Sequence, residues 1–450
     1  MKKQYNPPRI LRNQAGISNK IAYNRNSINF QDRISGVPVD QLVNKYGSPL
    51  FVFSEAKIRD SYRELTSILK KYYPNSEVSW SYKTNYLGAI CSILHQEGAK
   101  AEIVSIMEYE MAKHLGIAGE DIIFNGPGKR KDDLLRVVED GVVVHIDHFQ
   151  ELIMLEEVAN ELNLKPRVAI RINMDTGIYP QWQRFGFNYE NGEAYRTLQR
   201  LLQADKLELV GLHAHIGTFM LDATPYYVSA SKLLELAQRV KDNFGVVIEY
   251  IDLGGGFASK NTLHNQYTPG EFSSPSFDQY ATAISKAFNE SKFAKDEEPR
   301  LILETGRVLV DEAGTLITSV LGKKDLPTGE RAVIIDAGVN ILFTTWWYNL
   351  KVLPAQPISG TLLPTVFYGP LCMNIDIVKH ATPYPDLRVG DRLLVTPVGA
   401  YNVTQWMQFI EYRPGVCLIS EQGETHLIRE REELSDVNRR EKIPEYLRII

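Results

Sequence analysis

The stretch VSWSYKTNYLGAI, from Val78 to Ile90, joins an apolar run to the start of a helix through a lysine. Trp80 and Tyr82 alternate with serines, Lys83 follows them, and Leu-Gly-Ala-Ile begins a helical pattern. A lysine at the end of a strand is either a solvated strand end or a buried amine that takes part in chemistry. The choice depends on whether other strand ends in the chain also carry reactive groups.

The same step from a short apolar run to a helical segment occurs eight times. The runs are EVSWSY (77–82), KAEIV (100–104), DIIF (121–124), VVVHI (142–146), RVAIRI (167–172), LVGLHAHI (209–216), VIEYIDL (247–253) and RLILE (300–304). Most are continuous and rich in Val and Ile, which is typical of strands buried on both faces. Helical patterns lie between them, such as SIMEYEMAKHLG, which ends on Gly116. Eight such units predict a (β/α)8 barrel over residues 51–309, with a doubly wound open sheet as the competing interpretation.

The pattern changes after residue 309. RAVIIDAG, TVFYG, DRLLVTPVGAY and GVCLIS are short β-type runs between turn residues, with little helical periodicity. They predict a C-terminal, mostly antiparallel β domain over residues 310–450. Residues 1–50 are turn-rich and β-like, and we expect this N-terminal segment to pack with the β domain.

Composition excludes several classes of function. The net charge of -5 offers no basic surface for nucleic acid or an anionic membrane. No run approaches the ~20 apolar residues of a membrane helix, and the first residues lack the apolar core of a secretory signal. The three cysteines are far apart, and the nine histidines show no metal-ligand spacing, so we expect no metal site and a cytoplasmic location.

The predicted strand ends carry a non-random set of reactive residues, and in a barrel these ends meet at one face. The set is Lys83, His213, His215, Thr218, Gly254, Gly255, Gly256, Glu304 and Arg307. Three successive glycines let a phosphate approach the backbone closely, and an arginine adds a charge-assisted contact. Pyridoxal 5'-phosphate (PLP) uses a phosphate cradle, a lysine, a carboxylate and a ring-stacking group, so the set predicts PLP carried by Lys83.

Six motifs occur in one order along the chain: SYKTN, HIGT, GGGF, ETGR, GPLC followed by Asp, and GAY. Together they resemble the fold-type III PLP-dependent decarboxylases, the family of diaminopimelate, ornithine and arginine decarboxylases, whose barrel is similar to that of alanine racemase. The resemblance covers about residues 45 to 430. It implies a homodimer with two shared active sites and an amino acid as the substrate.

The resemblance also assigns roles to individual residues. Lys83 would form the Schiff base, His215 would stack on the ring and Glu304 would pair with the pyridine nitrogen. The phosphate would be held by Thr218, Gly254, Gly255, Gly256, Arg307 and Tyr401. Glu102 and Glu108 match an acidic pair near the lysine. Cys372 would reach across the dimer interface and protonate the carbanion left after CO2 departs.

The substrate pocket departs from the family pattern. Diaminopimelate decarboxylases usually carry Glu after the interface cysteine and ornithine decarboxylases carry Asp, whereas this chain has Met373. The segment that elsewhere supplies an arginine or a Tyr-Asp step reads NILFTTWWYNL here. The expected pocket residues are Met373, Asn374, Asp376, Thr344, Trp346 and Trp347.

This departure leaves several substrates open. A charged far end would lack its usual counter-ion unless Asp376 or Asp175 replaces it, because burying an unpaired charge costs several kcal/mol. The alternatives are a D-diamino acid in another orientation, or a substrate whose far end is amidated, acylated or carrier-linked and lies against the tryptophans. Trp346 and Trp347 could equally pack at the interface with the β domain.

Three functions are therefore compared. The leading hypothesis is decarboxylation of an amino acid of the diaminopimelate, lysine and ornithine class. The second is an amino-acid racemase on the same scaffold, against which Glu304 argues, because racemases of this fold place an arginine at the pyridine nitrogen. The third is a non-catalytic PLP-binding protein, which would have no use for the GPLC and GAY segments.

Overall fold

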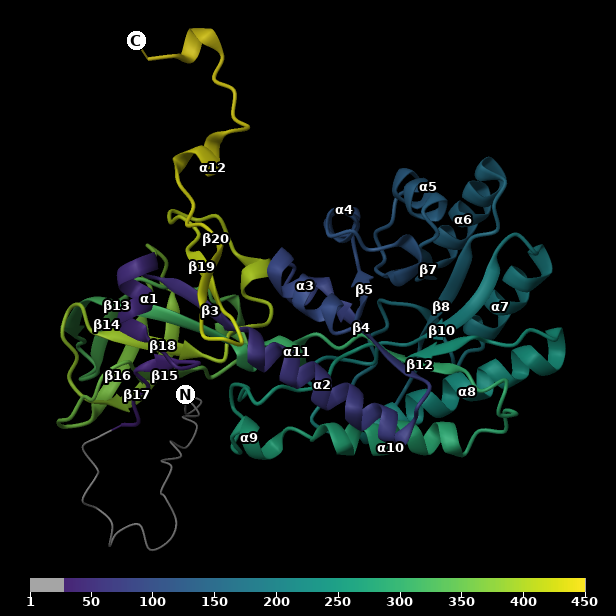
Figure 1. The fold of residues 1–450 in the computed structure, drawn as a ribbon, viewed down its shortest axis with the longest axis horizontal. Coiled ribbons are helices and arrows are strands. Elements are labelled where there is room, and N and C mark those ends of the chain that lie inside the picture. Colours follow the sequence, from purple (N-terminus) through teal and green to yellow (C-terminus); the bar gives the residue numbers. More distant parts are fainter. Residues whose placement is uncertain (1–27, 450) are drawn as a thin grey trace, which may run out of the picture.

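The computed structural model describes residues 28–449 of the chain. Residues 1–27, which belong to the N-terminal segment predicted at 1–50, and residue 450 lie outside the described part. Figure 1 shows two units side by side, a barrel wrapped by helices and a β domain, with α1 (Val39–Tyr46) lying among the strands of the β domain.

Eight parallel strands close into the barrel. They are β4 (Ser76–Ser81), β5 (Lys100–Ile103), β6 (Ile122–Phe124), β7 (Val143–Ile146), β8 (Arg167–Asn173), β10 (Glu208–His213), β11 (Tyr250–Asp252) and β12 (Arg300–Leu303). The ladder runs from β10 through β11, β12 and β4 to β8, and β8 pairs with β10 again. The ring therefore has no free edge, which confirms the predicted barrel and excludes the open sheet.

Helices between the strands form the outer layer of the barrel (Figure 1). They are α2 (Glu55–Tyr72), α3 (Gly88–Gln96), α4 (Ile106–His114), α5 (Lys131–Glu139), α6 (Phe149–Leu162), α7 (Glu193–Ala204), α8 (Thr224–Phe244) and α10 (Phe277–Asn289). Local signals set their ends. The Ser105 hydroxyl accepts a hydrogen bond from the Glu108 N–H at the start of α4, and Gly116 takes a positive φ of 81° just after it.

The inside of the barrel is packed rather than hollow at its lower end. Buried residues from six of the barrel strands, β6, β7, β8, β10, β11 and β12, form one cluster there: Ile123, Val143, Ala169, Val210, Tyr250 and Ile302. The outward faces of the strands pack against the helices in a larger continuous core. Polar side chains are therefore left for the upper layer and the carboxyl ends of the strands, where the candidate site lies.

The β domain is a nine-stranded, mostly antiparallel sheet. Its strands are β3 (Leu50–Ser54), β13 (Gly314–Asp325), β14 (Arg331–Ile335), β15 (Lys351–Pro354), β16 (Leu363–Tyr368), β17 (Ile377–Tyr384), β18 (Arg392–Thr396), β19 (Gly415–Ile419) and β20 (Thr425–Arg429). β3 pairs with both β13 and β19, so residues ahead of the barrel complete the sheet built after it. The sheet thus draws on both ends of the chain.

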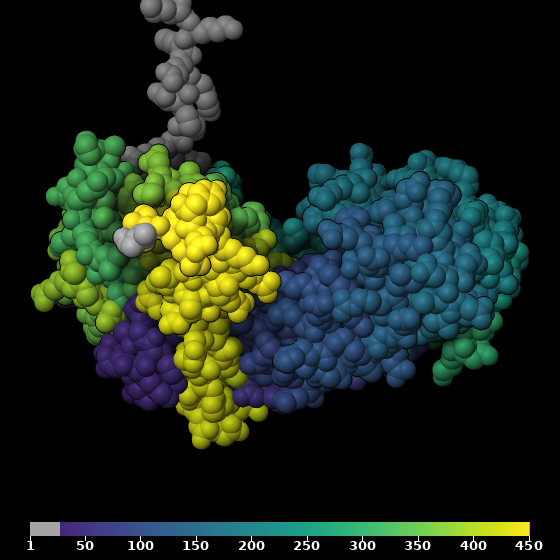
Figure 2. Space-filling model, turned by 90° about the horizontal axis from the view of Figure 1, so that it is seen from above, coloured from purple at the N-terminus to yellow at the C-terminus, as the bar shows by residue number. Residues whose placement is uncertain are grey.

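The remaining elements are short: β1 (Arg33–Ile34), β2 (Val37–Pro38), β9 (Phe187–Asn188), α9 (Gly270–Ser273), α11 (Arg307–Val310) and α12 (Leu434–Asn438). The space-filling view in Figure 2 shows the two units as separate lobes in contact. Within residues 28–449, no helix has the length and apolar character needed to cross a membrane.

Buried hydrogen bonds join the two lobes next to the candidate site. The buried Asp311, just after α11, accepts hydrogen bonds from the side chains of Ser259 and Asn261 and from the Ala400 N–H. The Tyr401 N–H donates to the carbonyl of Thr84, 2.9 Å away. The loop around Tyr401 in the β domain is thereby held directly above the strand end that carries Lys83.

Candidate active site

A cavity of about 710 Å³ lies where the carboxyl ends of the barrel strands meet the β domain. The barrel supplies most of its walls, and Trp347, Tyr348, Tyr401 and Gln405 come from the β domain. The predicted residues that line it are Lys83, His213, His215, Thr218, Glu304, Arg307, Trp347 and Tyr401, together with Glu102. Most of the residues predicted from the strand ends therefore lie together around this cavity.

Lys83 lies at the floor of this cavity, paired with Glu102. β4 ends at Ser81, and a single 3-10 turn (Tyr82–Thr84) carries the lysine across the barrel mouth. Its Nζ donates to both carboxylate oxygens of Glu102, at 2.8 and 2.6 Å. Burial by itself lowers the pKa of Lys83, but the Glu102 and Glu304 carboxylates outweigh it and raise that pKa above its usual range.

Glu108 lies behind this pair rather than in the cavity. Its carboxylate accepts a 2.7 Å hydrogen bond from the Val104 N–H, and the side chain is buried. Burial raises the pKa of Glu108 to about 7, and the Glu102 charge adds to that shift. Glu102 is thus the carboxylate in direct contact with the lysine.

Glu304 follows β12 and is buried on the floor of the cavity. The Asn125 amide donates both to Glu304, at 2.5 Å, and to Glu102, at 3.1 Å, so one side chain fixes both carboxylates. The His213 Nε2 lies 3.4 Å from the other Glu304 oxygen. Asn125 was not predicted, although it directly follows the apolar run of β6 and the strand-end rule could have found it.

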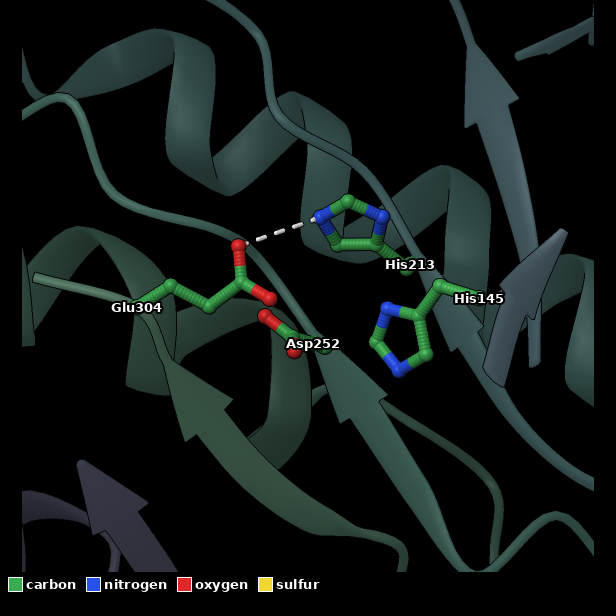
Figure 3. A group of neighbouring side chains, drawn as sticks. All are labelled: His145, His213, Asp252 and Glu304. Atoms are coloured by element: carbon green, nitrogen blue, oxygen red, sulfur yellow. Dashed lines mark ion pairs between the residues drawn. The ribbon is translucent and has the colours of Figure 1, made fainter. Parts of the chain in front are cut away.

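Glu304 belongs to a buried group of four polar side chains, shown in Figure 3, whose other members are His145, His213 and Asp252. One ligand-type atom from each lies within 4.8 Å of the others. Burial, together with the Glu304 charge, raises the pKa of Asp252 well above its usual range, and burial lowers the pKa of both histidines. These shifts favour the neutral form of all three residues.

The same four residues have the donor atoms of a metal site. A cation held there would compete with a ring nitrogen in the cavity for the Glu304 carboxylate.

The glycine run 254–256 lets neighbouring residues pack closely against its backbone, and two of its N–H groups are already hydrogen-bonded. The Gly254 N–H donates to Asp252 at 2.8 Å, and the Gly255 N–H donates to the His215 Nδ1 at 3.0 Å. A Cβ on Gly254 would lie 2.5 Å from that same Nδ1, and one on Gly255 would lie 2.4 Å from the Glu304 carbonyl oxygen. Side chains here would push His215 and Glu304 out of place.

His215 is neutral in its position on the cavity wall. Burial and the nearby Arg171 and Lys83 charges lower its pKa to about 3. Its ring lies 5.6 Å, centroid to centroid, from the ring of Trp182. A neutral imidazole can lie flat against an aromatic cofactor without a charge to desolvate.

Arg307 supplies the anion-binding character of the site. Its guanidinium donates to the Thr218 hydroxyl at 3.0 Å and to the Tyr348 hydroxyl, and it lies 4.7 Å from the centre of the Tyr401 ring. It is buried, and no carboxylate within residues 28–449 lies at ion-pair distance from it. Its hydrogen-bond partners are neutral and the buried Asp311 acts on it from beyond ion-pair distance, so a phosphate group would give this guanidinium a direct anionic partner.

Two residues of this wall were missed by the sequence analysis. Tyr348 belongs to the segment after β14 and reaches Arg307 from the β domain. Arg171 lies within β8, where it reads as an ordinary strand residue, and its guanidinium lies 3.2 Å from Asp147. Neither position carries a strand-end signal.

The expected pocket residues are more dispersed. Trp347 lines the cavity, whereas Trp346, Thr344, Met373, Asn374, Asp376 and Cys372 do not line the cavity of their own chain. Thr344 is buried and hydrogen-bonded to Asn402. Cys372 is exposed, on the loop 370–375.

Comparisons with known proteins agree with this geometry. Residues 56–311 match the family model described as pyridoxal-dependent decarboxylase, pyridoxal binding domain. A diaminopimelate decarboxylase of Methanocaldococcus jannaschii is 30% identical over 437 residues, which cover 92% of this chain and 95% of the relative. That of Aquifex aeolicus is 30% identical over 409 residues, 89% of this chain and 93% of the relative.

The solved structures agree as well. The crystal structure of the M. jannaschii diaminopimelate decarboxylase superposes with a TM-score of 0.85 at 28% identity and covers 95% of this chain and 100% of that chain. All of these relatives decarboxylate, which favours decarboxylation over racemisation. The buried anion site at Arg307, the Lys83–Glu102 pair and Glu304 are the groups that PLP requires. The chain therefore belongs to the pyridoxal-dependent decarboxylases of fold type III and is a PLP-dependent amino-acid decarboxylase.

Proposed function

We propose that the chain removes the α-carboxylate of an amino acid at the floor of this cavity, with Lys83 as the attachment residue of PLP and Cys372 of a partner subunit as the proton donor. The observation that carries the proposal is the buried Arg307, hydrogen-bonded to the hydroxyls of Thr218 and Tyr348, in the same cavity as the Lys83–Glu102 pair and Glu304. When bound, PLP supplies the electron sink for the bond that breaks.

Each residue of the floor has a definite task in this mechanism. Glu102 accepts the proton that Lys83 gives up when the lysine bonds to the cofactor. Glu304 holds a proton on the ring nitrogen, and Asn125 keeps that carboxylate oriented. The neutral imidazole of His215, on the cavity wall, would stack on the ring of the bound cofactor.

Arg307 and the residues around it would hold the phosphate group of the cofactor away from Lys83. Arg307 and Thr218 donate to the phosphate, and Tyr348 and Tyr401 fix the guanidinium by a hydrogen bond and a ring contact. Such an anchor stays in place through the whole cycle, because it does not involve the reacting carbon.

Cys372 lies on the loop 370–375, whose shape is set by Asp376. Both Asp376 oxygens accept backbone N–H hydrogen bonds, from Val339 and Leu371 at 2.8 Å each. Because the exposed Cys372 does not line its own cavity, the proposal includes a homodimer in which this loop completes the partner's site. We also retain the expectation of a cytoplasmic location, which suits three unpaired cysteines.

The test combines attachment with turnover. We expect borohydride reduction of the PLP-loaded protein, followed by peptide mass spectrometry, to label Lys83, and amino acids to release CO2. Lys83→Ala should remove both signals, while Lys113→Ala, a lysine paired with Asp140 outside the cavity, should retain both. A label at another lysine, or CO2 release by Lys83→Ala, would contradict the assignment.

The shared site has its own test. Lys83→Ala and Cys372→Ala subunits are each expected to be inactive or nearly so. Mixing them should restore activity, because one site of each mixed dimer then combines an intact lysine with an intact cysteine. If the mixture stays as inactive as its components, Cys372 acts within its own chain or not at all.

A further inference from the structure

The upper wall of the cavity is uncharged among the described residues. The charged or imidazole side chains that line the cavity are Lys83, Glu102, Arg171, His213, His215, Glu304 and Arg307. All lie with the cofactor groups, and Arg171 has Asp147 as its counter-ion. The rest of the wall is mainly aromatic and aliphatic, with Tyr179, Trp182, Phe219, Leu221, Leu263 and Trp347.

Neither carboxylate expected to serve the far end of the substrate is available to it. Asp376 is 1% exposed, and both of its oxygens already accept backbone hydrogen bonds. Asp175 accepts a 2.8 Å hydrogen bond from the Gly177 N–H and does not line the cavity. The first residue shapes the loop 370–375 and the second shapes a turn.

The loop proposed to enter from the partner subunit adds no charge either. Its sequence is PLCMNI, from Pro370 to Ile375, and Cys372, Asn374 and Ile375 are exposed. A distal ammonium or carboxylate in the completed cavity would lose water without meeting an opposite charge. This loss costs several kcal/mol.

From this arrangement we infer that the substrate is an amino acid whose side chain ends in a neutral group, an acylated amine or an amidated carboxylate, that lies against Trp347 and Trp182. The inference rests on the proposed function, because the α-amino and α-carboxylate groups are placed by PLP on Lys83. The uncharged wall replaces the salt bridge that a free diamino or diacid substrate would need. The aromatic rings contact the amide and its alkyl arm.

The experiment compares matched pairs of substrates on the PLP-loaded protein. The pairs are lysine with Nε-acetyl-lysine and glutamate with glutamine, each in both enantiomers. We expect kcat/KM for the neutral member to exceed that of the charged member by at least about 100-fold, from the penalty on an unpaired buried charge. Equal or better turnover of the charged member would overturn the inference.

A binding readout separates this inference from the proposed function. The same compounds are titrated while the absorbance of the bound PLP is followed, which reports binding without CO2 release. Tighter binding of the neutral members with no CO2 from any compound would overturn decarboxylation and support the neutral pocket. CO2 release without preference for either member would overturn the neutral pocket and support decarboxylation.

A charge placed on the wall gives a second test. Gln405 lines the cavity, and Gln405→Glu would provide the missing counter-ion for a distal ammonium. We expect this variant to raise kcat/KM for lysine at least about tenfold, whereas the control Gln408→Glu, outside the cavity lining, leaves it unchanged. An unchanged lysine rate in Gln405→Glu would count against the inference.

Discussion

The floor and the upper wall of one cavity follow opposite rules. At the floor, Lys83 pairs with Glu102, and Asn125 donates hydrogen bonds to both the Glu102 and the Glu304 carboxylates. On the upper wall, Trp347 lies with Leu221, Leu263 and Phe219 in the cavity lining. If the proposals above hold, electrostatics at the floor specifies the reaction, and the shape and neutrality of the wall select the substrate. Substitutions on the two sides should therefore affect different kinetic constants.

The largest effect is expected from Glu304→Gln. The amide keeps the shape but cannot hold a proton on the ring nitrogen, so kcat should fall roughly 10²–10³-fold with little change in KM. Steady-state CO2 release measures both constants. Glu312→Gln, an exposed glutamate paired with Lys260, is the matched control. A loss confined to KM would show that Glu304 binds substrate instead.

Arg307→Lys is expected to weaken cofactor binding. Lysine keeps the charge but loses the forked contact to phosphate and the hydrogen bond to Tyr348. Charged hydrogen bonds contribute about 1.5–3 kcal/mol, so the Kd for PLP should rise roughly 10- to 100-fold. Titration of the apoprotein with PLP, followed by absorbance, gives the Kd. An unchanged Kd would remove Arg307 from the phosphate site.

Trp347→Ala tests the wall. We expect KM for the neutral substrate to rise roughly tenfold while kcat changes little, because an aromatic contact is lost away from the reacting carbon. The neighbouring Trp346 is 52% exposed and does not line the cavity, so Trp346→Ala should leave both constants as they were. Equal effects of the two variants would argue that the tryptophans act only in packing.

The last prediction concerns how the free energy of unfolding depends on pH, through Glu108 at the edge of the cavity floor. Burial raises the pKa of Glu108 to about 7, above the ~4.3 of an unfolded glutamate. The folded state therefore binds more protons than the unfolded state between about pH 4.5 and 7, and the free energy of unfolding falls as pH rises through that range.

Glu108→Gln removes this titration. We expect the loss of stability between pH 5 and pH 8 to be about 2 kcal/mol smaller in the variant than in the parent chain. Urea unfolding at a series of pH values measures it. Parallel pH profiles for the two proteins would mean that Glu108 titrates normally.

Much of the floor could be read from the chain. Lys83, Thr218, Glu304 and Arg307 lie at or within three residues of the end of an apolar run, and closure of eight such runs into a ring brings their ends together. Asn125 also follows an apolar run directly, but the sequence analysis did not identify it as a site residue. The sequence analysis placed Asp376 in the substrate pocket because of its position in GPLCMNID. In the structure its side chain is buried, and each of its oxygens accepts a backbone hydrogen bond.

The sequence by itself determined the barrel, the β domain and the chemistry of the floor, because strand periodicity and strand ends are local properties of the chain. Only the tertiary structure decided the upper wall. Tyr348 meets Arg307 across 41 positions, and Trp347 faces the cavity while Trp346 faces solvent. No local pattern distinguishes those neighbours, because the face that each presents is set by how the β domain docks on the barrel. The same docking brings Trp347 and Gln405, and no charged side chain of the β domain within residues 28–449, into the cavity lining.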